Sequence, residues 1–124
     1  MTARARSTLA VALLFVSACT FYCVEVVDTL YFGTMKADGS VVTDAQWQRF
    51  VVDVIAPRLE GFTTWDAEGL YRTSSGAVQH ERTHIVQIVH ANERAVAEII
   101  AAYKKQFAQE SVLRLRGRAG VAFQ

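Results

Sequence analysis

Two segments with helical apolar spacing constrain the fold of this chain more than any other feature. Each segment places its apolar residues on one face, as a helix that covers a sheet must do. These residues are Trp47, Phe50, Val51, Val54 and Ile55 in the first segment, and Val96, Ile99, Ile100, Tyr103 and Phe107 in the second. Segments rich in β-branched and aromatic residues separate and flank the two helices. The sequence therefore predicts an α+β domain.

Four strand-like segments surround these helices. They are residues 24–32, 62–66, 83–90 and 112–115, with 70–72 and 121–123 as candidate extensions and turns at 38–39 and 67–69. The segment 83–90 is almost continuously apolar, which favours a central position in a sheet. The order strand, helix, strand, strand, helix, strand predicts a ferredoxin-like βαββαβ fold. In that fold two helices cover one face of a four-stranded antiparallel sheet, and the other face stays open.

The ends of both helices are marked in the sequence. Thr43 and Gln46 have the spacing of a capping box, and Asn92 is a suitable cap for the second helix. Pro57 disfavours helical geometry at Ala56 and should end the first helix there or shortly after.

The first nineteen residues predict where the protein goes. Arg4 and Arg6 form a positive region, residues 9–16 are apolar, and Val16-Ser17-Ala18-Cys19 is typical of a lipobox. We therefore expect a lipoprotein signal peptide over residues 1–18, a short tether over 19–27 and one domain over 28–124. Acylation of Cys19 would anchor the domain to a membrane of the bacterial cell envelope.

Two alternatives for this segment stay open. Ordinary signal peptidase could cut at the same bond and release a soluble secreted protein in which Cys19 and Cys23 form a disulfide. The segment could also remain as an anchor, although the apolar run 9–24 has only 16 residues. A membrane-spanning helix needs about 20.

Several fragments of the chain resemble domain-of-unknown-function family 3574, a group of secreted or lipoprotein-like bacterial proteins. The resemblance runs from Thr29 to the C-terminus. It departs from the family at Leu70-Tyr71, where members often carry Gln-Trp, and in lacking a cysteine in the last strand. It implies export and brings no established catalytic residues. The fragments are Leu30-Tyr31-Phe32-Gly33, Val42-Thr43-Asp44-Ala45-Gln46-Trp47, Ala56-Pro57-Arg58-Leu59, Asp66-Ala67-Glu68-Gly69, Ala102-Tyr103-Lys104-Lys105-Gln106-Phe107 and Gln109-Glu110-Ser111-Val112-Leu113-Arg114.

The segment His80-Glu81-Arg82-Thr83-His84 matches the H-E-x-x-H zinc-protease motif, which needs a helix to bring both histidines to one metal. Here the motif runs into a predicted strand, where His80 and His84 would lie roughly 13 Å apart. A zinc–nitrogen bond of about 2.1 Å cannot bridge that distance. We interpret the match as coincidental and predict neither a metal nor a cofactor. A looser pairing of His84 or His90 with a distant carboxylate stays open.

Arg114, Arg116 and Arg118 alternate along the last strand and share one face if the strand is regular. We expect Leu113 and Leu115 to face the helices, so that the arginines line the open face of the sheet. There they could dock an anionic ligand, a lipid headgroup or an acidic partner. Alternatively, they form a solvated face paired with local carboxylates.

Trp65 and Tyr71 lie near the predicted hairpin and complete the candidate binding surface. We expect a noncatalytic binding or interaction module, with a possible homodimer through the open face of the sheet. The alternative is a small enzyme with a pocket at a dimer interface. The chain has 13 basic and 12 acidic residues, and this balance argues against nucleic-acid binding.

Overall fold

The computed structural model describes residues 21–72, 74–89 and 92–124. The predicted signal peptide, Cys19 and His90 lie outside the described residues. No helix in the described ranges is long and apolar enough to cross a membrane. The elements are β1 (Cys23–Gly33), α1 (Asp44–Phe50), η1 (Val51–Ile55), η2 (Ala56–Arg58), β2 (Thr63–Arg72), β3 (Val78–Val89), α2 (Glu93–Phe107) and β4 (Leu113–Val121).

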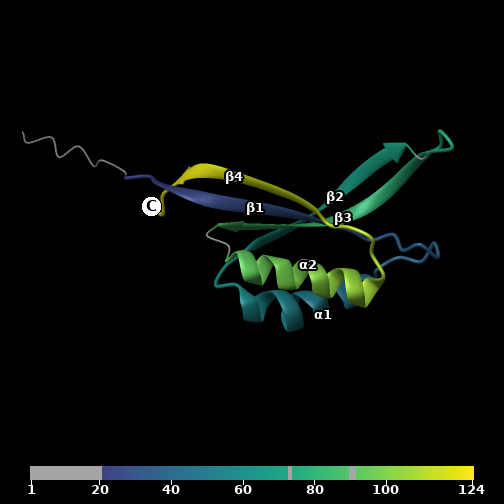
Figure 1. Cartoon of the computed structure of the whole chain (residues 1–124), viewed down its shortest axis with the longest axis horizontal. Helices are drawn as coiled ribbons and strands as arrows, with labels where there is room; N and C mark the ends of the chain where they lie inside the picture. Colours follow the sequence, from purple (N-terminus) through teal and green to yellow (C-terminus); the bar gives the residue numbers. More distant parts are fainter. Residues whose placement is uncertain (1–20, 73, 90–91) are drawn as a thin grey trace, which may run out of the picture.

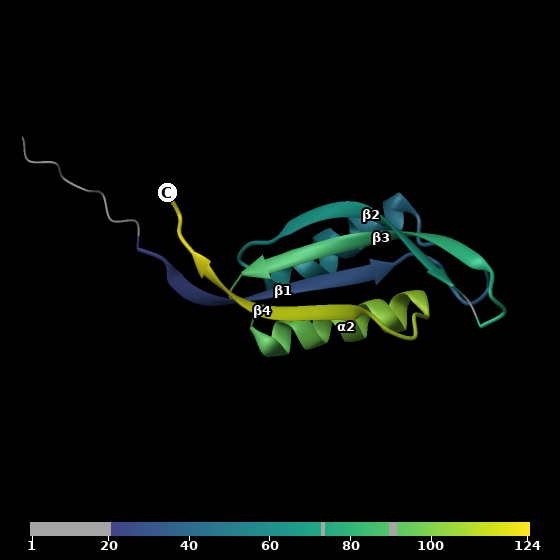
Figure 2. The same cartoon turned by 90° about the horizontal axis from the view of Figure 1, so that it is seen from above.

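The strands form one antiparallel sheet in the order β2-β3-β1-β4, and both helices lie on the same side of it (Figure 1). This arrangement confirms the predicted ferredoxin-like α+β fold. Figure 2 shows the sheet from above, with β3 between β2 and β1, which confirms its predicted central position. The side of the sheet opposite the helices is covered by no described element.

The predicted turn at 67–69 is wrong, because β2 runs through it without interruption. Ala67, Glu68 and Gly69 pair with β3 residues, and the ladder continues to Arg72 and Val78. Gly69 lies within this ladder, where a Cβ would meet the carbonyl oxygen of Glu81 at 3.6 Å, an ordinary contact, so the strand does not require glycine here. Likewise, β4 is one regular strand from Leu113 to Val121.

The predicted N-caps of both helices are confirmed, whereas α1 ends at Phe50 and Ala56 keeps helical geometry, so that helical turns end only after Pro57, at Arg58. The Thr43 side chain accepts from the backbone N–H of Gln46, and the Gln46 side chain accepts from that of Thr43, which completes the capping box. After α1 the chain continues as a π-helical turn, η1, and a single 3-10 turn, η2, which contains Pro57. The Asn92 side chain accepts from the backbone N–H of Arg94 and caps α2.

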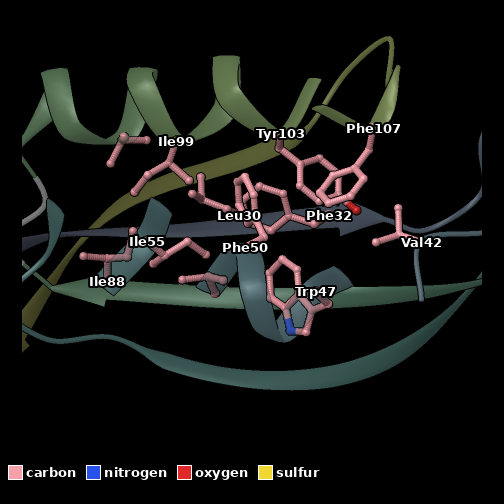
Figure 3. Close-up of a cluster of buried hydrophobic side chains, with 12 residues drawn as sticks. Leu30, Phe32, Val42, Trp47, Phe50, Ile55, Ile88, Ile99, Tyr103 and Phe107 are labelled. Atoms are coloured by element: carbon pink, nitrogen blue, oxygen red, sulfur yellow. The ribbon is translucent and has the colours of Figure 1, made fainter. Parts of the chain in front are cut away.

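Aromatic rings from both helices and β1 form the centre of the core (Figure 3). The Phe32 ring centroid lies 5.4 Å from that of Trp47 and 4.7 Å from that of Tyr103. The buried Tyr103 hydroxyl donates to the carbonyl oxygen of Gly33 at 2.8 Å. These contacts fix β1 beneath both helices, so the end of β1 is held in place for the features described next.

Candidate functional site

The side chains of β4 point to the opposite sides of the sheet from those predicted from the sequence. Leu113 and Leu115 are 57% and 51% exposed, and they lie on the open face of the sheet. Arg114 and Arg116 lie on the side of the helices, where both bind Asp28 of β1. The prediction that these arginines line the open face is therefore wrong. Arg118, two residues further along the same regular strand, shares their side and is exposed.

A buried carboxylate explains the orientation of β4. Asp28 is fully buried on the core side of β1, and its oxygens accept from Arg114 at 2.8 and 3.2 Å and from Arg116 at 3.1 Å. Arg114 also reaches Glu93 in the first turn of α2 at 2.7 and 2.8 Å. A buried charge is tolerated only when it is paired and hydrogen-bonded. The cluster of Asp28, Arg114, Arg116 and Glu93 therefore holds β1, β4 and α2 together.

Charge interactions within this cluster shift the ionisation of its members. Burial acts to raise the pKa of Asp28, but hydrogen bonds and charge from Arg114 and Arg116 outweigh it and hold that pKa below its usual range. Hydrogen bonding to Glu93 and Asp28 raises the pKa of Arg114. The guanidinium groups are thus engaged by local carboxylates, which matches the alternative in which the arginines pair locally.

A row of apolar residues instead crosses the open face of the sheet, and the centre of this face carries no charge. Strand register places Trp65, Ile85, Tyr31 and Leu113 in one row across all four strands. Ile85 is 4% exposed although it is no part of the core cluster beneath the helices. Trp65 is 41% exposed, as predicted for a surface residue. The backbone of Tyr71 lies in β2, and its side chain is outside the described part of the chain.

The charged residues of the strands are distributed unequally between the two faces. Among the described strands, the register places only Glu25 and Glu81 on the open face, and they lie at opposite ends of it. An antiparallel sheet with one solvated face normally carries polar residues there. The open face follows this rule in part, because Thr29, Thr83 and Gln87 lie on it beside the apolar row.

The H-E-x-x-H segment lies on β3, a strand, as the sequence predicted. His84 faces the helices, where its ring stacks on Trp47 with a centroid distance of 4.3 Å, and its Nδ1 lies 2.6 Å from Asp66 Oδ1. Hydrogen bonds from Arg82 and His84 lower the pKa of Asp66. His84 thus packs as a core residue beside a carboxylate. Within the described ranges, no three His, Cys, Asp or Glu side chains are grouped to hold a metal ion.

Glu81 lies at one end of the open face, directly above a glycine. A Cβ at Gly33 would come within 2.7 Å of Glu81 Oε1 and 3.2 Å of Oε2, so only glycine leaves room for the carboxylate. Glu81 Oε1 accepts from the backbone N–H of Met35 at 2.7 Å. Sequence reasoning noticed Glu81 only within the H-E-x-x-H match. Its position opposite Gly33 depends on the register of β1 and β3, which the sequence does not reveal.

A groove of about 820 Å³ surrounds this carboxylate. It lies between the loop after β1 and the connection from α2 to β4, which are tied together because Gln109 Nε2 donates to the carbonyl oxygen of Met35 at 2.9 Å. Met35 is therefore held at its N–H by Glu81 and at its carbonyl by Gln109. Residues of the open face that line the groove include Tyr31, Gly33, Gly69, Thr83 and Leu113.

The fold and this site define a small α+β protein with an uncovered, largely uncharged sheet face and a groove at its end. A family model described as "Protein of unknown function (DUF3574)" matches residues 27–123, and the chain belongs to this family. This confirms the resemblance seen in the sequence. A comparison with curated proteins finds no significant match.

Two solved structures of a phage SAM lyase have a similar fold. One, in complex with S-methyl-5'-thioadenosine, is 19% identical, with a TM-score of 0.55, covering 81% of this chain and 85% of the other. The other, in the apo state, is 18% identical, with a TM-score of 0.56, covering 82% of this chain and 86% of the other. At this identity the likeness establishes the fold alone.

Replacing Asp28 with Asn should destabilise the domain by about 3 kcal/mol, because two arginines lose the carboxylate that neutralises them. Urea unfolding at neutral pH measures the loss. The exposed Asp53→Asn variant is the matched control and should change stability by less than about 0.5 kcal/mol. Equal stability of the two variants would show that the cluster does not support the fold.

The same pair of proteins gives a pH test. The pKa of Asp28 is depressed below its ordinary value of 3.8 in the folded state, so its contribution is complete above that value. The contribution is lost as the pH falls through the lower, folded pKa. The difference between wild type and Asp28→Asn should therefore be constant near neutrality and shrink in acid.

Proposed function

We propose that this protein is a noncatalytic interaction module that associates with a second copy of itself through the open sheet face. The observation that carries the proposal is the absence of charge from the centre of this face, together with outward Leu113 and Leu115. Exposed apolar side chains that gather on one face of a soluble protein mark a candidate interaction site. Because the centre of this face carries no charge, it can pack against its own copy across a two-fold axis without placing like charges together there.

The four-stranded part of the face is short. All four strands lie side by side only along the rows of Thr63, Thr64 and Trp65 of β2, and the β1–β4 and β2–β3 pairs extend beyond these rows at opposite ends. Because a stable interface buries about 800 Å² on each partner, a second copy must also cover parts of these two strand pairs. Exposed Trp65 supplies an aromatic anchor of the kind enriched in interfaces.

The proposed place of action is the bacterial cell envelope. The lipobox Val16-Ser17-Ala18-Cys19 supports export and lipid attachment at Cys19. The first described residues lead directly into β1, so an anchor at Cys19 would sit a few residues from the sheet. The anchored domain would then associate with a copy on the same membrane.

A small enzyme is the second candidate, and the groove beside Glu81 favours it. The groove brings a partly buried carboxylate, a tyrosine and a threonine together at the end of the open face, and its volume lies within the range of ligand sites. A second copy on the open face would border this groove. The phage SAM lyase of similar fold suggests S-adenosylmethionine as the first compound to test.

Light scattering of the purified full chain should show a dimer, and Leu115→Lys should shift it to monomer because a charge then enters the apolar face. The control is Val52→Lys, which changes an exposed valine of η1 on the helical side. A wild-type chain that stays monomeric at micromolar concentration would refute self-association through this face.

Labelling of bacterial cells with radioactive palmitate should mark the wild-type protein. Cys19→Ala should remove the label and move the protein out of the membrane fraction, because the acylated residue is gone. Cys23→Ala, which changes an exposed cysteine at the start of β1, should keep both properties. Label retained in Cys19→Ala would contradict the lipoprotein assignment.

If the enzyme candidate is correct, incubation with S-adenosylmethionine should yield S-methyl-5'-thioadenosine above the level without protein, as measured by mass spectrometry. Glu81→Gln should reduce this yield at least tenfold, about 1.4 kcal/mol in activation free energy. A dimeric protein that forms no product would leave the interaction module as the function and remove the candidate that this compound tests.

A further inference from the structure

We propose that the groove beside Glu81 binds a small organic cation that carries an aromatic or apolar body. Such a ligand would place its ammonium group against the Glu81 carboxylate and its body along Tyr31 and Leu113. This inference does not require self-association of the chain, and it holds whether or not a reaction follows binding.

The Glu81 carboxylate is only partly engaged by hydrogen bonds from the protein itself. Glu81 is partly buried, and its Oε1 already accepts from the backbone N–H of Met35 at 2.7 Å. Among the described side chains, which do not include that of Tyr71, Oε2 has neither a hydrogen-bond nor an ion-pair partner. A partly buried carboxylate with one free oxygen attracts a cationic donor, and the reduced dielectric strengthens that attraction.

The ammonium group that already lies at the groove does not neutralise Glu81. Lys36 also lines the groove, but its Nζ lies over the Phe107 ring, 5.9 Å from the centroid. In the described part of the chain, Lys36 makes no ion pair with Glu81. The carboxylate is therefore left for a cation that comes from outside.

The shape of the groove also suits such a ligand. Gly33 of β1 and Gly69 of β2 lie on either side of β3 and bear no side chains, so the sheet is hollowed around Glu81. Tyr31 and Leu113 are directly paired across β1 and β4 and form the apolar wall of the groove. An aromatic ring beside a carboxylate suits an organic cation, which gains from both charge and ring contact.

Contacts within the protein hold the groove in position before any ligand binds. The Met35 peptide is fixed on one side by Glu81 and on the other by Gln109, which ties the rim loop to the connection between α2 and β4. Gln79 contacts the Met35 sulfur from β3. A ligand therefore meets a carboxylate whose orientation is already determined, which lowers the entropic cost of binding.

The test compares tyramine with para-ethylphenol, which has the same body without the ammonium group. Calorimetric titration of the purified full chain should show tyramine binding at least tenfold more tightly than para-ethylphenol. Glu81→Gln should remove this preference, because glutamine keeps an acceptor for the Met35 N–H while losing the charge. Glu68→Gln, which changes an exposed carboxylate of β2 on the other face, should bind like wild type.

Gly33→Ala provides a second test, because its Cβ would displace the Glu81 carboxylate, and it should weaken tyramine binding without abolishing the dimer. Equal affinities for the two compounds, no binding of tyramine at millimolar concentration, or an unchanged preference in Glu81→Gln would each overturn the proposal. A monomeric wild type that keeps Glu81-dependent binding of tyramine would refute self-association and leave the cation site intact.

Discussion

The burial of one carboxylate determines how the sheet of this protein is built. Asp28 lies in the middle of β1 and faces the helices, where no water can solvate its charge. The chain neutralises it with two arginines from β4 and connects these to Glu93 at the start of α2. The edge strand therefore turns its charged residues inward and its leucines outward, and the character of the open face follows from that choice.

The two faces of the sheet therefore differ in where their charged and apolar residues lie. The helical side contains both the aromatic core and the ion pairs of Asp28 and Asp66, so charge is satisfied within the domain. The opposite side has an apolar row across its centre and a carboxylate at each end. The open face therefore remains available to a partner or a ligand. This supports both the proposed interaction surface and the proposed binding groove.

The sequence predicted the fold class, the helix ends and the central strand because these depend on local patterns. The capping box at Thr43, the proline at position 57 and the apolar run of β3 each act over a few residues. The orientation of β4 could not be predicted in this way. An alternating Leu–Arg strand is symmetrical in pattern, and the apolar-inward rule chooses the wrong face when a buried acid demands arginine. Asp28 among the otherwise apolar residues on the same side of that strand was the available signal.

The candidate site was missed for a related reason. Glu81 and Gly33 are 48 positions apart in the chain, and their contact exists only because β1 and β3 pair in one particular register. Gly69 appeared to mark a turn, since glycine is common in turns, whereas here it lies in the middle of β2 opposite Glu81. Residues that act by being small or by lying opposite one another carry little information until the strands are aligned.

At Gly33 a single residue separates the core of the domain from the groove. The Tyr103 hydroxyl donates to the Gly33 carbonyl from the helical side, and the Glu81 carboxylate lies over the same residue from the open side. Burial, and to a smaller extent the charge of Glu81, raises the pKa of Tyr103. Gly33 therefore contacts the core through its carbonyl oxygen and the groove through the space that its missing side chain leaves, so a change at this one residue reaches both.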